Sequence, residues 1–344
     1  MADTNISQNI SKSESDIGFP RRMNVATALN SKYMRYAYVM LTSLFQNQLQ
    51  CRDEIHVYLL HSDLTAQDQE HLKSLAQKYG HKVHFLLINR ESFPASLPTT
   101  TEWSLETYFR LMLLDILPND VDRLLYLDVD MIINKPVDEL YFTDFEDCCF
   151  CACRDMTVEL PFPDIRNEIF KEHIAQDFTY FNAGLMLWNI EKLRGSYSFK
   201  DYMELAHKLN YQMLAPDQDL LNYMHWNQVK FVDEYQYDLF SKIAYNYDIH
   251  YEQVKAETTI IHFAGPKPWE GEYVHYDIEQ LWWDYAKQTP FYAELMEEFL
   301  HASLNNPLVY DTLNSLSEEK QRLAEELQKS SALCRKLMQL LESQ

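Results

Sequence analysis

Two aspartates interrupt an apolar run near the middle of the chain. The run reads RLLYLDVDMII from residue 123 to 133, and one valine separates Asp128 from Asp130. In extended backbone, residues two apart point to the same side, so the two carboxylates need a cation near them. Oxygen ligands suit hard ions such as Mg²⁺ or Mn²⁺, which in turn bind diphosphates. The alternative is that the aspartates cap the strand, because a lone D-x-D is a weak pattern.

A second candidate is the segment TTIIHFAGPKPWE, residues 258 to 270, which ends a buried-strand pattern in His262. Gly265 would let the backbone approach a ligand closely, and Lys267 on a proline-stiffened turn would supply a positive charge. An anionic leaving group needs such a charge. Taken alone, His262 is more often a hydrogen-bonded core histidine than a ligand.

Three further segments combine polar residues with apolar runs. DFTYFNAGLMLWNI places Asn182 at the head of such a run. APDQDLLN places Asp217 and Gln218 at a predicted helix start, where N-capping is the alternative explanation for Asp217. LETYFRLMLLDIL sets Arg110 within an amphipathic helix, from which an arginine can simply extend to solvent.

The elements that would position these residues alternate along the chain. Strands alternating with helices predict an α/β fold with a largely parallel sheet covered on both faces. Such sheets place their sites at the carboxyl ends of strands, where Asp128 and Asp130 fall. The predicted strands are 23–29, 54–60, 82–88 and 123–130, and the predicted helices are 33–47, 65–79 and 105–116.

Composition limits the partners and the location. At 344 residues the chain allows two domains, or one large α/β domain with appendages. A formal net charge of -22 argues against nucleic acid or anionic lipid as the main partner. The polar segment 1–22 lacks the apolar core of a signal peptide, and no later window has the apolar length of a membrane span. We therefore expect a flexible N-terminal segment, no integral membrane span and a cytoplasmic location.

Four of the six cysteines crowd into CCFCAC, residues 148 to 153. Cys149, Cys151 and Cys153 alternate along a predicted strand, whereas metal sites usually hold paired cysteines on turns. We interpret these three as small apolar residues on one side of a buried strand. Zinc binding is the alternative.

Six segments together resemble the family 8 retaining glycosyltransferases, which include glycogenin and bacterial galactosyl- and glucosyltransferases of surface glycans. They cover about residues 23 to 285 in the family's order and approximate spacing. The segments are NVATALNSKYMRYAYVMLTSL, TYFRLMLLDILP, RLLYLDVDMII, YFNAGLMLWNIEKLR, PDQDLLN and IIHFAGPKPW.

The resemblance implies a single Rossmann-like nucleotide-sugar-binding domain of GT-A type, which we place at 23–300. We expect a helical extension at 301–344, which departs from the family pattern. It implies transfer of glucose or galactose from a UDP-sugar, with Mn²⁺ as cofactor and Mg²⁺ as the alternative. The acceptor would be a glycan, lipid-linked or protein hydroxyl, with a bacterial surface glycan as the working choice.

The same resemblance assigns roles to individual residues. Asp217 and Gln218 would be the catalytic pair, with Gln218 positioning the sugar. Asp217 as a nucleophile and front-face attack without one both stay open. Asp128, Asp130 and His262 would hold the metal, Gly265 and Lys267 would lie near the diphosphate, Tyr33 would stack on uracil, and Arg110, Val129, Asn182 and Ala183 would join the catalytic pair around the donor.

The chain departs from the family pattern at the residues expected to bind the uracil base. Where the family often has Asp-Asp-Asn before the aromatic residue, this chain reads Asn30-Ser31-Lys32-Tyr33. We expect the Asn30 amide oxygen to accept the uracil N3–H, more weakly than a carboxylate would. Lys32 would add positive charge near the nucleotide.

The end of the chain carries a different pattern. Residues 310–344 hold five basic and six acidic side chains, which favours a helix that packs on protein. A homodimer through a coiled coil at 309–341 is one hypothesis, and a helix folded back on its own domain is the other. The 4-3 spacing runs through Val309, Leu313, Leu316, Lys320, Leu323, Leu327, Ser330, Cys334, Leu337 and Leu341.

Two other functions compete with sugar transfer. YLDVDMII also resembles the motif of haloacid-dehalogenase-like phosphatases, although those usually carry it in their first strand. A donor-binding protein that has lost turnover is the second, prompted by Asn30. The tyrosine-rich segment 234–251 would stack on an acceptor sugar, pack in the core or form a lid.

Overall fold

The computed structural model describes residues 21–49, 51, 53–100, 104–271 and 276–342. Along the last helix, the side chains of 307–310, 312–313, 333–334 and 336–342 lie outside the description. Most of the predicted flexible segment 1–22 also lies outside it, although Arg22 already belongs to the first strand. The chain divides into two compact units, 1–262 and 263–344. The predicted domain limits, with a boundary at 300, stay a prediction.

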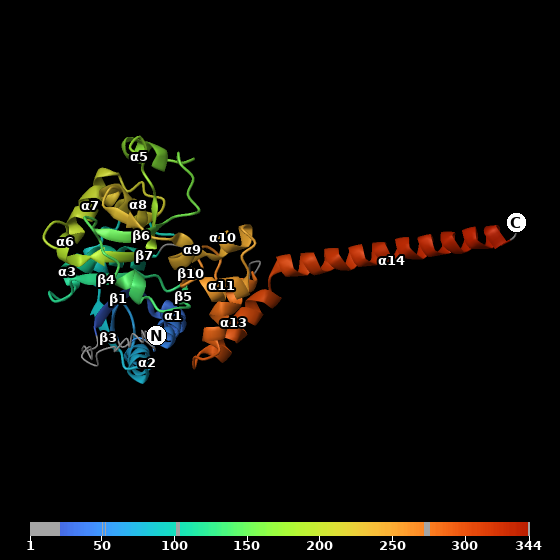
Figure 1. The fold of residues 1–344 in the computed structure, drawn as a ribbon, viewed down its shortest axis with the longest axis horizontal. Coiled ribbons are helices and arrows are strands. Elements are labelled where there is room, and N and C mark those ends of the chain that lie inside the picture. Colours follow the sequence, from blue (N-terminus) through green and yellow to red (C-terminus); the bar gives the residue numbers. More distant parts are fainter. Residues whose placement is uncertain (1–20, 50, 52, 101–103, 272–275, 343–344) are drawn as a thin grey trace, which may run out of the picture. The chain divides into compact units, whose positions relative to one another are not determined.

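The first unit is built around a seven-stranded sheet with flanking helices (Figure 1). The strand order is β3-β2-β1-β4-β7-β6-β8. The pairs β3–β2, β2–β1 and β1–β4 are parallel. β7 is antiparallel to both β4 and β6, and β8 is parallel to β6. The predicted α/β fold is confirmed. The strands are β1 (Arg22–Leu29), β2 (Glu54–His61), β3 (Lys82–Leu87), β4 (Arg123–Leu127), β6 (Phe150–Arg154), β7 (Phe181–Asn189) and β8 (Val229–Phe231).

A smaller sheet connects two distant parts of the same unit. β5 (Met131–Ile133) is antiparallel to β10 (Ile260–His262), which is parallel to β9 (Leu239–Phe240). In this register Met131 lies opposite His262. The residue before β5 is Asp130, so strand pairing brings the D-x-D segment to the end of β10.

Helices connect and cover the strands of the first unit. The segment predicted as one helix over 105–116 is instead a 3-10 helix, Leu105–Met112, followed by the short α3. The helices are α1 (Met34–Asn47), α2 (Ala66–Lys78), α3 (Leu113–Ile116), α4 (Asp138–Tyr141), α5 (Arg166–Ile174), α6 (Ile190–Leu193), α7 (Phe199–Lys208), α8 (Pro216–His225), α9 (Glu234–Tyr237), α10 (Ser241–Asn246) and α11 (Tyr251–Glu257), with further 3-10 turns at Ser31–Tyr33 and Arg90–Ser92.

The core explains the continuous apolar runs of the sequence. Every residue of β7 except Asn189 is buried, as expected for a strand covered on both faces. Cys151 and Cys153 lie two apart in β6, and both are fully buried, as is nearly all of Cys149. Burial raises the pKa of the Cys151 thiol to about 11. The apolar interpretation of these cysteines is therefore favoured over zinc binding.

The second unit is helical within its described residues. It contains α12 (Gln280–Ala286), α13 (Tyr292–Leu304) and α14 (Pro307–Glu342), with a 3-10 turn at Asp277–Glu279. α14 spans 36 residues, so the predicted C-terminal helix is present. None of the helices described in the chain is both long and apolar enough to cross a membrane.

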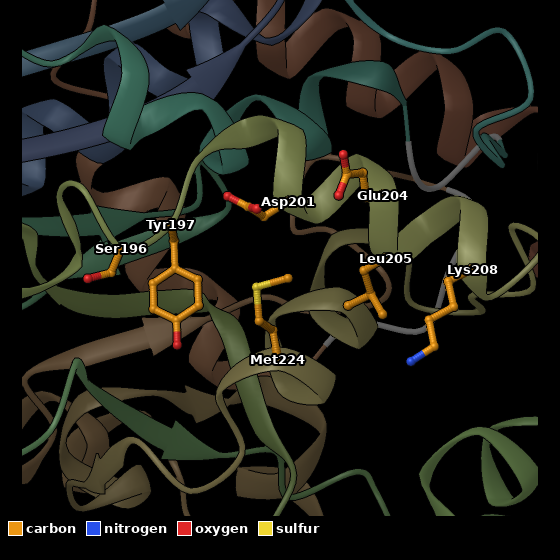
Figure 2. A pocket seen from close by; sticks show the side chains of 7 residues that line it. All are labelled: Ser196, Tyr197, Asp201, Glu204, Leu205, Lys208 and Met224. Atoms are coloured by element: carbon orange, nitrogen blue, oxygen red, sulfur yellow. The ribbon is translucent and has the colours of Figure 1, made fainter.

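An open cavity of about 500 Å³ lies beside α7 and α8 (Figure 2). Its Asp201 already caps α7 by accepting bonds from Ser198, and the Tyr197 hydroxyl accepts from Gln228. Its lining contains none of the predicted site residues. Its lining residues are Ser196, Tyr197, Asp201, Glu204, Leu205, Lys208 and Met224.

Candidate active site

Three side chains meet where β4 and β10 end. Asp128 and Asp130 lie in the turn between β4 and β5, and not within an extended strand as predicted. The Asp128 N–H donates to the Gly184 carbonyl on β7 at 2.9 Å, which fixes the start of this turn. His262 ends β10. One ligand atom from each of the three lies within 4.8 Å of the others, and we call these residues the acid cluster.

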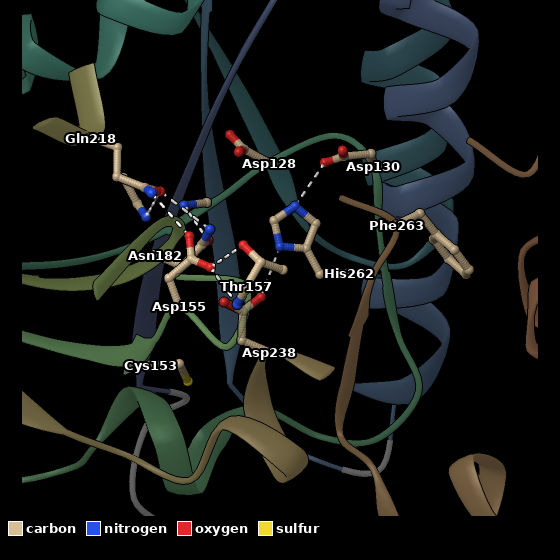
Figure 3. Close-up of polar contacts among 12 residues, drawn as sticks. Asp128, Asp130, Cys153, Asp155, Thr157, Asn182, Gln218, Asp238, His262 and Phe263 are labelled. Atoms are coloured by element: carbon tan, nitrogen blue, oxygen red, sulfur yellow. Dashed lines mark hydrogen bonds and ion pairs between the residues drawn. The ribbon is translucent and has the colours of Figure 1, made fainter. Parts of the chain in front are cut away.

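The His262 ring is held from both sides (Figure 3). Its Nδ1 lies 2.9 Å from Asp238 Oδ1, and its Nε2 lies 3.4 Å from Asp130 Oδ1. Burial disfavours the imidazolium, but the carboxylates of Asp130 and Asp238 outweigh it and raise the pKa of His262 to about 10. His262 is thus a buried, hydrogen-bonded histidine whose Nε2 faces the D-x-D turn.

The acid cluster fits a divalent cation. Carboxylate oxygens and an imidazole nitrogen are suitable ligands for Mn²⁺. At metal sites, a histidine ligand usually hydrogen-bonds a carboxylate through its other ring nitrogen, as His262 Nδ1 does here. Burial raises the pKa of Asp128 to about 6 although Arg110 opposes the shift. A cation would relieve this cost, because it favours the charged form of each carboxylate.

Gly184 leaves the space in which the cluster converges. A Cβ at this position would lie 2.6 Å from His262 Cε1 and 2.8 Å from Asp128 Oδ2. It would also lie 2.8 Å from Asn182 Oδ1. A residue without a side chain is therefore required at this point of β7.

Arg110 connects the acid cluster to α8. Its Nη2 donates to Asp128 Oδ1 at 2.8 Å, and its Nε lies 2.8 Å from Asp217 Oδ2, an ion pair outside hydrogen-bond geometry. Arg110 is 4% exposed, so the alternative of a solvent-directed arginine is wrong. Asp217 is not the N-cap of α8, because Ala215 holds that position, but backbone N–H groups of the first helical turn stabilise its carboxylate. The guanidinium compensates the buried carboxylate of Asp217 and the partly exposed carboxylate of Asp128.

A second group of polar residues, which we call the amide network, consists of Asp155, Asn182 and Gln218 (Figure 3). Gln218 Oε1 accepts from Asn182 Nδ2 at 3.2 Å and from the Ala183 N–H at 2.8 Å. Gln218 Nε2 donates to Asp155 Oδ2 at 3.0 Å. The other Asp155 oxygen accepts from the N–H and the hydroxyl of Thr157. These bonds fix the orientation of the Gln218 amide.

The residues predicted to bind the base lie at the start of α1. Asn30 Oδ1 accepts from the N–H groups of Lys32 and Tyr33, and its Nδ2 donates to Glu106 Oε2 at 3.3 Å. The amide oxygen therefore caps this turn. The Tyr33 ring is half-buried and meets the Tyr36 ring edge-on, with centroids 5.5 Å apart. Lys32 is exposed.

The remaining predicted residues fall in two places. Val129 and Ala183 are buried beside the acid cluster and the amide network, and the Ala183 carbonyl accepts a bond from Arg110 Nη1. Gly265 and Lys267 belong to the second unit, where Gly265 has a φ of 91° and Lys267 Nζ donates to the Phe263 carbonyl at 3.0 Å. Their predicted roles at the diphosphate stay predictions.

Sequence reasoning missed Asp155 and Asp238. Asp155 directly follows β6, so the rule that sites lie at strand ends could have identified it. Asp238 is one of two aspartates in the tyrosine-rich segment 234–251 and stands directly before the two-residue strand β9. No spacing pattern distinguishes it from a surface aspartate.

The sequence matches a known protein family over most of its length. Residues 24–272 match the family described as Glycosyl transferase family 8. A lipopolysaccharide 1,3-galactosyltransferase of Salmonella typhimurium is 26% identical and aligns with 83% of this chain and 82% of its own length. A lipopolysaccharide 1,2-glucosyltransferase of Escherichia coli is 28% identical, with 72% and 73% covered.

Solved structures agree with this match. An active-site mutant of LgtC superposes with a TM-score of 0.66 at 25% identity, covering 77% of this chain and 96% of LgtC. The complex of the galactosyltransferase LgtC with donor and acceptor sugar analogs gives a TM-score of 0.63 at 24% identity, with 78% and 96% covered. These matches leave the phosphatase alternative without support.

Proposed function

The chain belongs to glycosyltransferase family 8, and from this premise we propose that it transfers glucose or galactose from a UDP-sugar to an acceptor hydroxyl. The observation that carries the proposal is the acid cluster, whose three ligand atoms lie within 4.8 Å of one another. The acceptor we propose is a bacterial surface glycan, because relatives described as lipopolysaccharide glycosyltransferases align with most of this chain. A cytoplasmic location agrees with a nucleotide-sugar donor and remains part of the proposal.

Asp128, Asp130 and His262 would hold Mn²⁺, with Mg²⁺ as the alternative. The bound ion would neutralise the negative charge that builds on the donor diphosphate as the sugar leaves. Asp238 supports this assignment, since it fixes the His262 ring with Nε2 toward Asp130. Lys267 would add a second positive charge at the departing phosphate, and Gly265 would allow its close approach.

The residues along Arg110 and α8 would bind the sugar. Gln218 has partners at both ends of its amide, which suits a positioning role and leaves it no part as a nucleophile. The Asp217 carboxylate is buried, and its Oδ2 makes no hydrogen bond to the described residues although it lies beside Arg110. This oxygen would accept a sugar hydroxyl or face the anomeric carbon.

Retention of the anomeric configuration follows from the family resemblance and has two explanations on these residues. A covalent intermediate would need Asp217 as the nucleophile. Burial raises the pKa of Asp217 although Arg110 opposes the shift, and attack by this carboxylate would give up its ion pair with Arg110. We therefore favour front-face attack, in which the departing phosphate oxygen takes the acceptor proton and the protein supplies position and charge.

The nucleotide would bind at the start of α1, with uracil stacked on Tyr33. Because Asn30 Oδ1 already accepts two backbone N–H groups, the uracil N3–H would be its third partner or would bond to a different acceptor. Base selectivity is therefore expected to be looser than in relatives with an aspartate at this position.

The test measures release of UDP from a panel of UDP-sugars, with and without Mn²⁺, using slow hydrolysis to water as the acceptor reaction. Wild type is compared with Asp130→Asn and with Asp147→Asn, which removes one charge at an exposed aspartate. We expect one sugar to turn over only with metal, in wild type and Asp147→Asn but not in Asp130→Asn.

Two results would change the proposal. Binding of UDP and Mn²⁺ by calorimetry without turnover of any sugar, even with lipopolysaccharide fragments as acceptors, would favour a donor-binding protein that has lost turnover. Absence of UDP binding would overturn the uridine assignment.

A further inference from the structure

The longest helix of the chain has an apolar stripe that the proposed function does not use. α14 spans Pro307–Glu342, and among its described side chains Leu316, Leu323 and Leu327 are 58%, 55% and 69% exposed. Their spacing of seven and four residues places them on one side of the helix. Each leucine leaves apolar surface in water, and burial of this surface against a partner would be favourable.

The exposure extends along the helix. Every described side chain from 314 to 330 is exposed, and the structure gives these residues one ion pair, between Arg322 and Glu319 of the same helix. A lone surface leucine needs no explanation, but three in heptad register form a seam. The sequence extends this seam through Val309, Leu313, Cys334, Leu337 and Leu341, whose side chains lie outside the described residues.

The charges on α14 favour another protein helix, and not a membrane, as the partner that buries the leucine stripe. A helix that lies on an anionic membrane carries Lys and Arg on its polar face and few acidic residues. α14 instead has acidic pairs at Glu318–Glu319 and Glu325–Glu326, and residues 310–344 carry six acidic against five basic side chains. Anionic lipid would be repelled by these pairs.

The polar residues of the seam match a second copy of the same helix. If Leu316 and Leu323 occupy d positions, Leu327 and Lys320 occupy a positions, and Glu319 is the g residue directly before Lys320. In a parallel two-stranded coil an a side chain packs beside the g residue of the facing helix. Each Lys320 would then meet Glu319 of the other copy, so one charge pair forms on each side of the axis.

We propose that α14 is a dimerisation helix, which pairs in parallel and in register with α14 of a second copy of this chain. Lys320 at the seam fixes the register, since a polar a residue specifies alignment and partner number at some cost in stability. Ser317 and Ala324 at the e positions leave room for close approach of the two helices. The proposal is independent of the sugar-transfer chemistry.

The first test is sedimentation of the full chain across a wide range of concentration. We expect twice the protomer mass in wild type, and a shift toward the protomer in the triple variant Leu316→Glu, Leu323→Glu, Leu327→Glu. The matched control is Asn314→Glu, Gln321→Glu, Gln328→Glu, which adds the same three charges at b positions. The control should stay dimeric, and circular dichroism should show the same helix content in both variants.

A second test separates self-pairing from any other cover. Lys320→Leu should tighten the dimer, with a dissociation constant at least about tenfold lower, because it replaces a polar layer with leucine. Leu323→Cys should form an intermolecular disulfide on mild oxidation faster than Gln321→Cys, since an in-register parallel pair places the two d residues face to face.

Three results would overturn the proposal. A wild-type chain that sediments as a protomer at all concentrations would show that α14 has another cover. Equal behaviour of the two triple variants would show that the leucine seam is not the contact. Equal cross-linking at positions 321 and 323 would exclude the parallel register.

Discussion

The acid cluster and the amide network both lie beside β7, but they manage their polar groups in opposite ways. In the acid cluster, the ligand atoms of Asp128, Asp130 and His262 lie close together. Burial there disfavours the charged form of Asp128. In the amide network, each end of the Gln218 amide has a hydrogen-bond partner at 2.8–3.2 Å. A group of ligands that needs a cation can receive one, whereas a satisfied network holds its neighbours in place.

Arg110 connects the acid cluster to Asp217 on α8, next to Gln218 of the amide network, so its removal should have the largest effect. Arg110→Ala would leave Asp217 as a buried carboxylate without its counter-charge and would remove one partner of Asp128, whose side chain is 27% exposed, so it should lower the free energy of unfolding by about 3 kcal/mol. The measurement is urea denaturation at neutral pH. Arg154→Ala is the control, because its ion pair with Glu234 involves an arginine that is 55% exposed and should contribute at most about 1 kcal/mol. Equal losses in the two variants would contradict a structural role for the bridge.

Gly184→Ala should break the acid cluster, and its added Cβ would also crowd Asn182 Oδ1 in the amide network. The added Cβ would lie 2.6 Å from His262 Cε1, so turnover should fall by about a hundredfold or more and Mn²⁺ should no longer raise the melting temperature. Leu185→Ala on the same strand is the control. It should lower stability by about 2–5 kcal/mol, yet keep the metal-induced shift. A Gly184→Ala protein with normal metal response would refute the steric argument.

Asp238→Asn should weaken the metal site without touching a ligand. Loss of the carboxylate that holds His262 Nδ1 should reduce Mn²⁺ affinity by about 10–100-fold. Free Mn²⁺ can be counted by electron paramagnetic resonance in the absence of sugar, so turnover is not needed. Asp233→Asn, at the cap of α9, removes the same charge nearby and should leave affinity unchanged. Equal affinity in wild type and Asp238→Asn would sink the positioning role.

Asp155→Ala should affect the amide network alone. Without the acceptor for Gln218 Nε2, the amide is free to rotate, and we expect kcat to fall about tenfold while Mn²⁺ affinity stays at the wild-type value. Thr157→Val removes one bond to the other Asp155 oxygen and should have a smaller effect. A fall in metal affinity in Asp155→Ala would show that the two regions are not separate.

The last prediction concerns stability and not turnover, and involves the anchoring of α8, which carries Asp217 and Gln218. His225 is fully buried at the end of this helix, where its Nε2 lies 2.9 Å from the Tyr202 hydroxyl. Burial lowers the pKa of His225 to about 4. Between about pH 6.5 and pH 4 the unfolded chain therefore binds a proton that the folded chain does not, so stability falls as the pH falls.

His225→Gln should remove this contribution. Between pH 7 and pH 5, wild type should lose about 2 kcal/mol more of its unfolding free energy than the variant, as measured by urea denaturation at each pH. Parallel losses in the two proteins would mean that His225 is not the titrating group.

Much of the fold followed from local patterns. β1, β2 and β3 lie within one residue of their predicted limits, because alternating strands and helices produce strong apolar runs. The segment at 105–116 was predicted as one α-helix, but eight of its residues form a 3-10 helix, in which Arg110 reaches Asp128 and Asp217. Hydrophobic periodicity does not separate this 3-10 helix from an α-helix, and both ion-pair partners of Arg110 are distant in the sequence.

By itself the sequence determined the residue types of the site: a D-x-D turn, a histidine at the end of a strand, and an aspartate and a glutamine at a helix start. These are local patterns, since strand ends and helix starts are visible in hydrophobic periodicity. Only the tertiary structure decided which of them meet. The pairing of β5 with β10 places His262 opposite Met131, and the missing side chain of Gly184 admits Asp128 beside it. Asp238 and Asp155 entered the site the same way, because contacts across 24 and 63 residues of sequence leave no trace in local spacing.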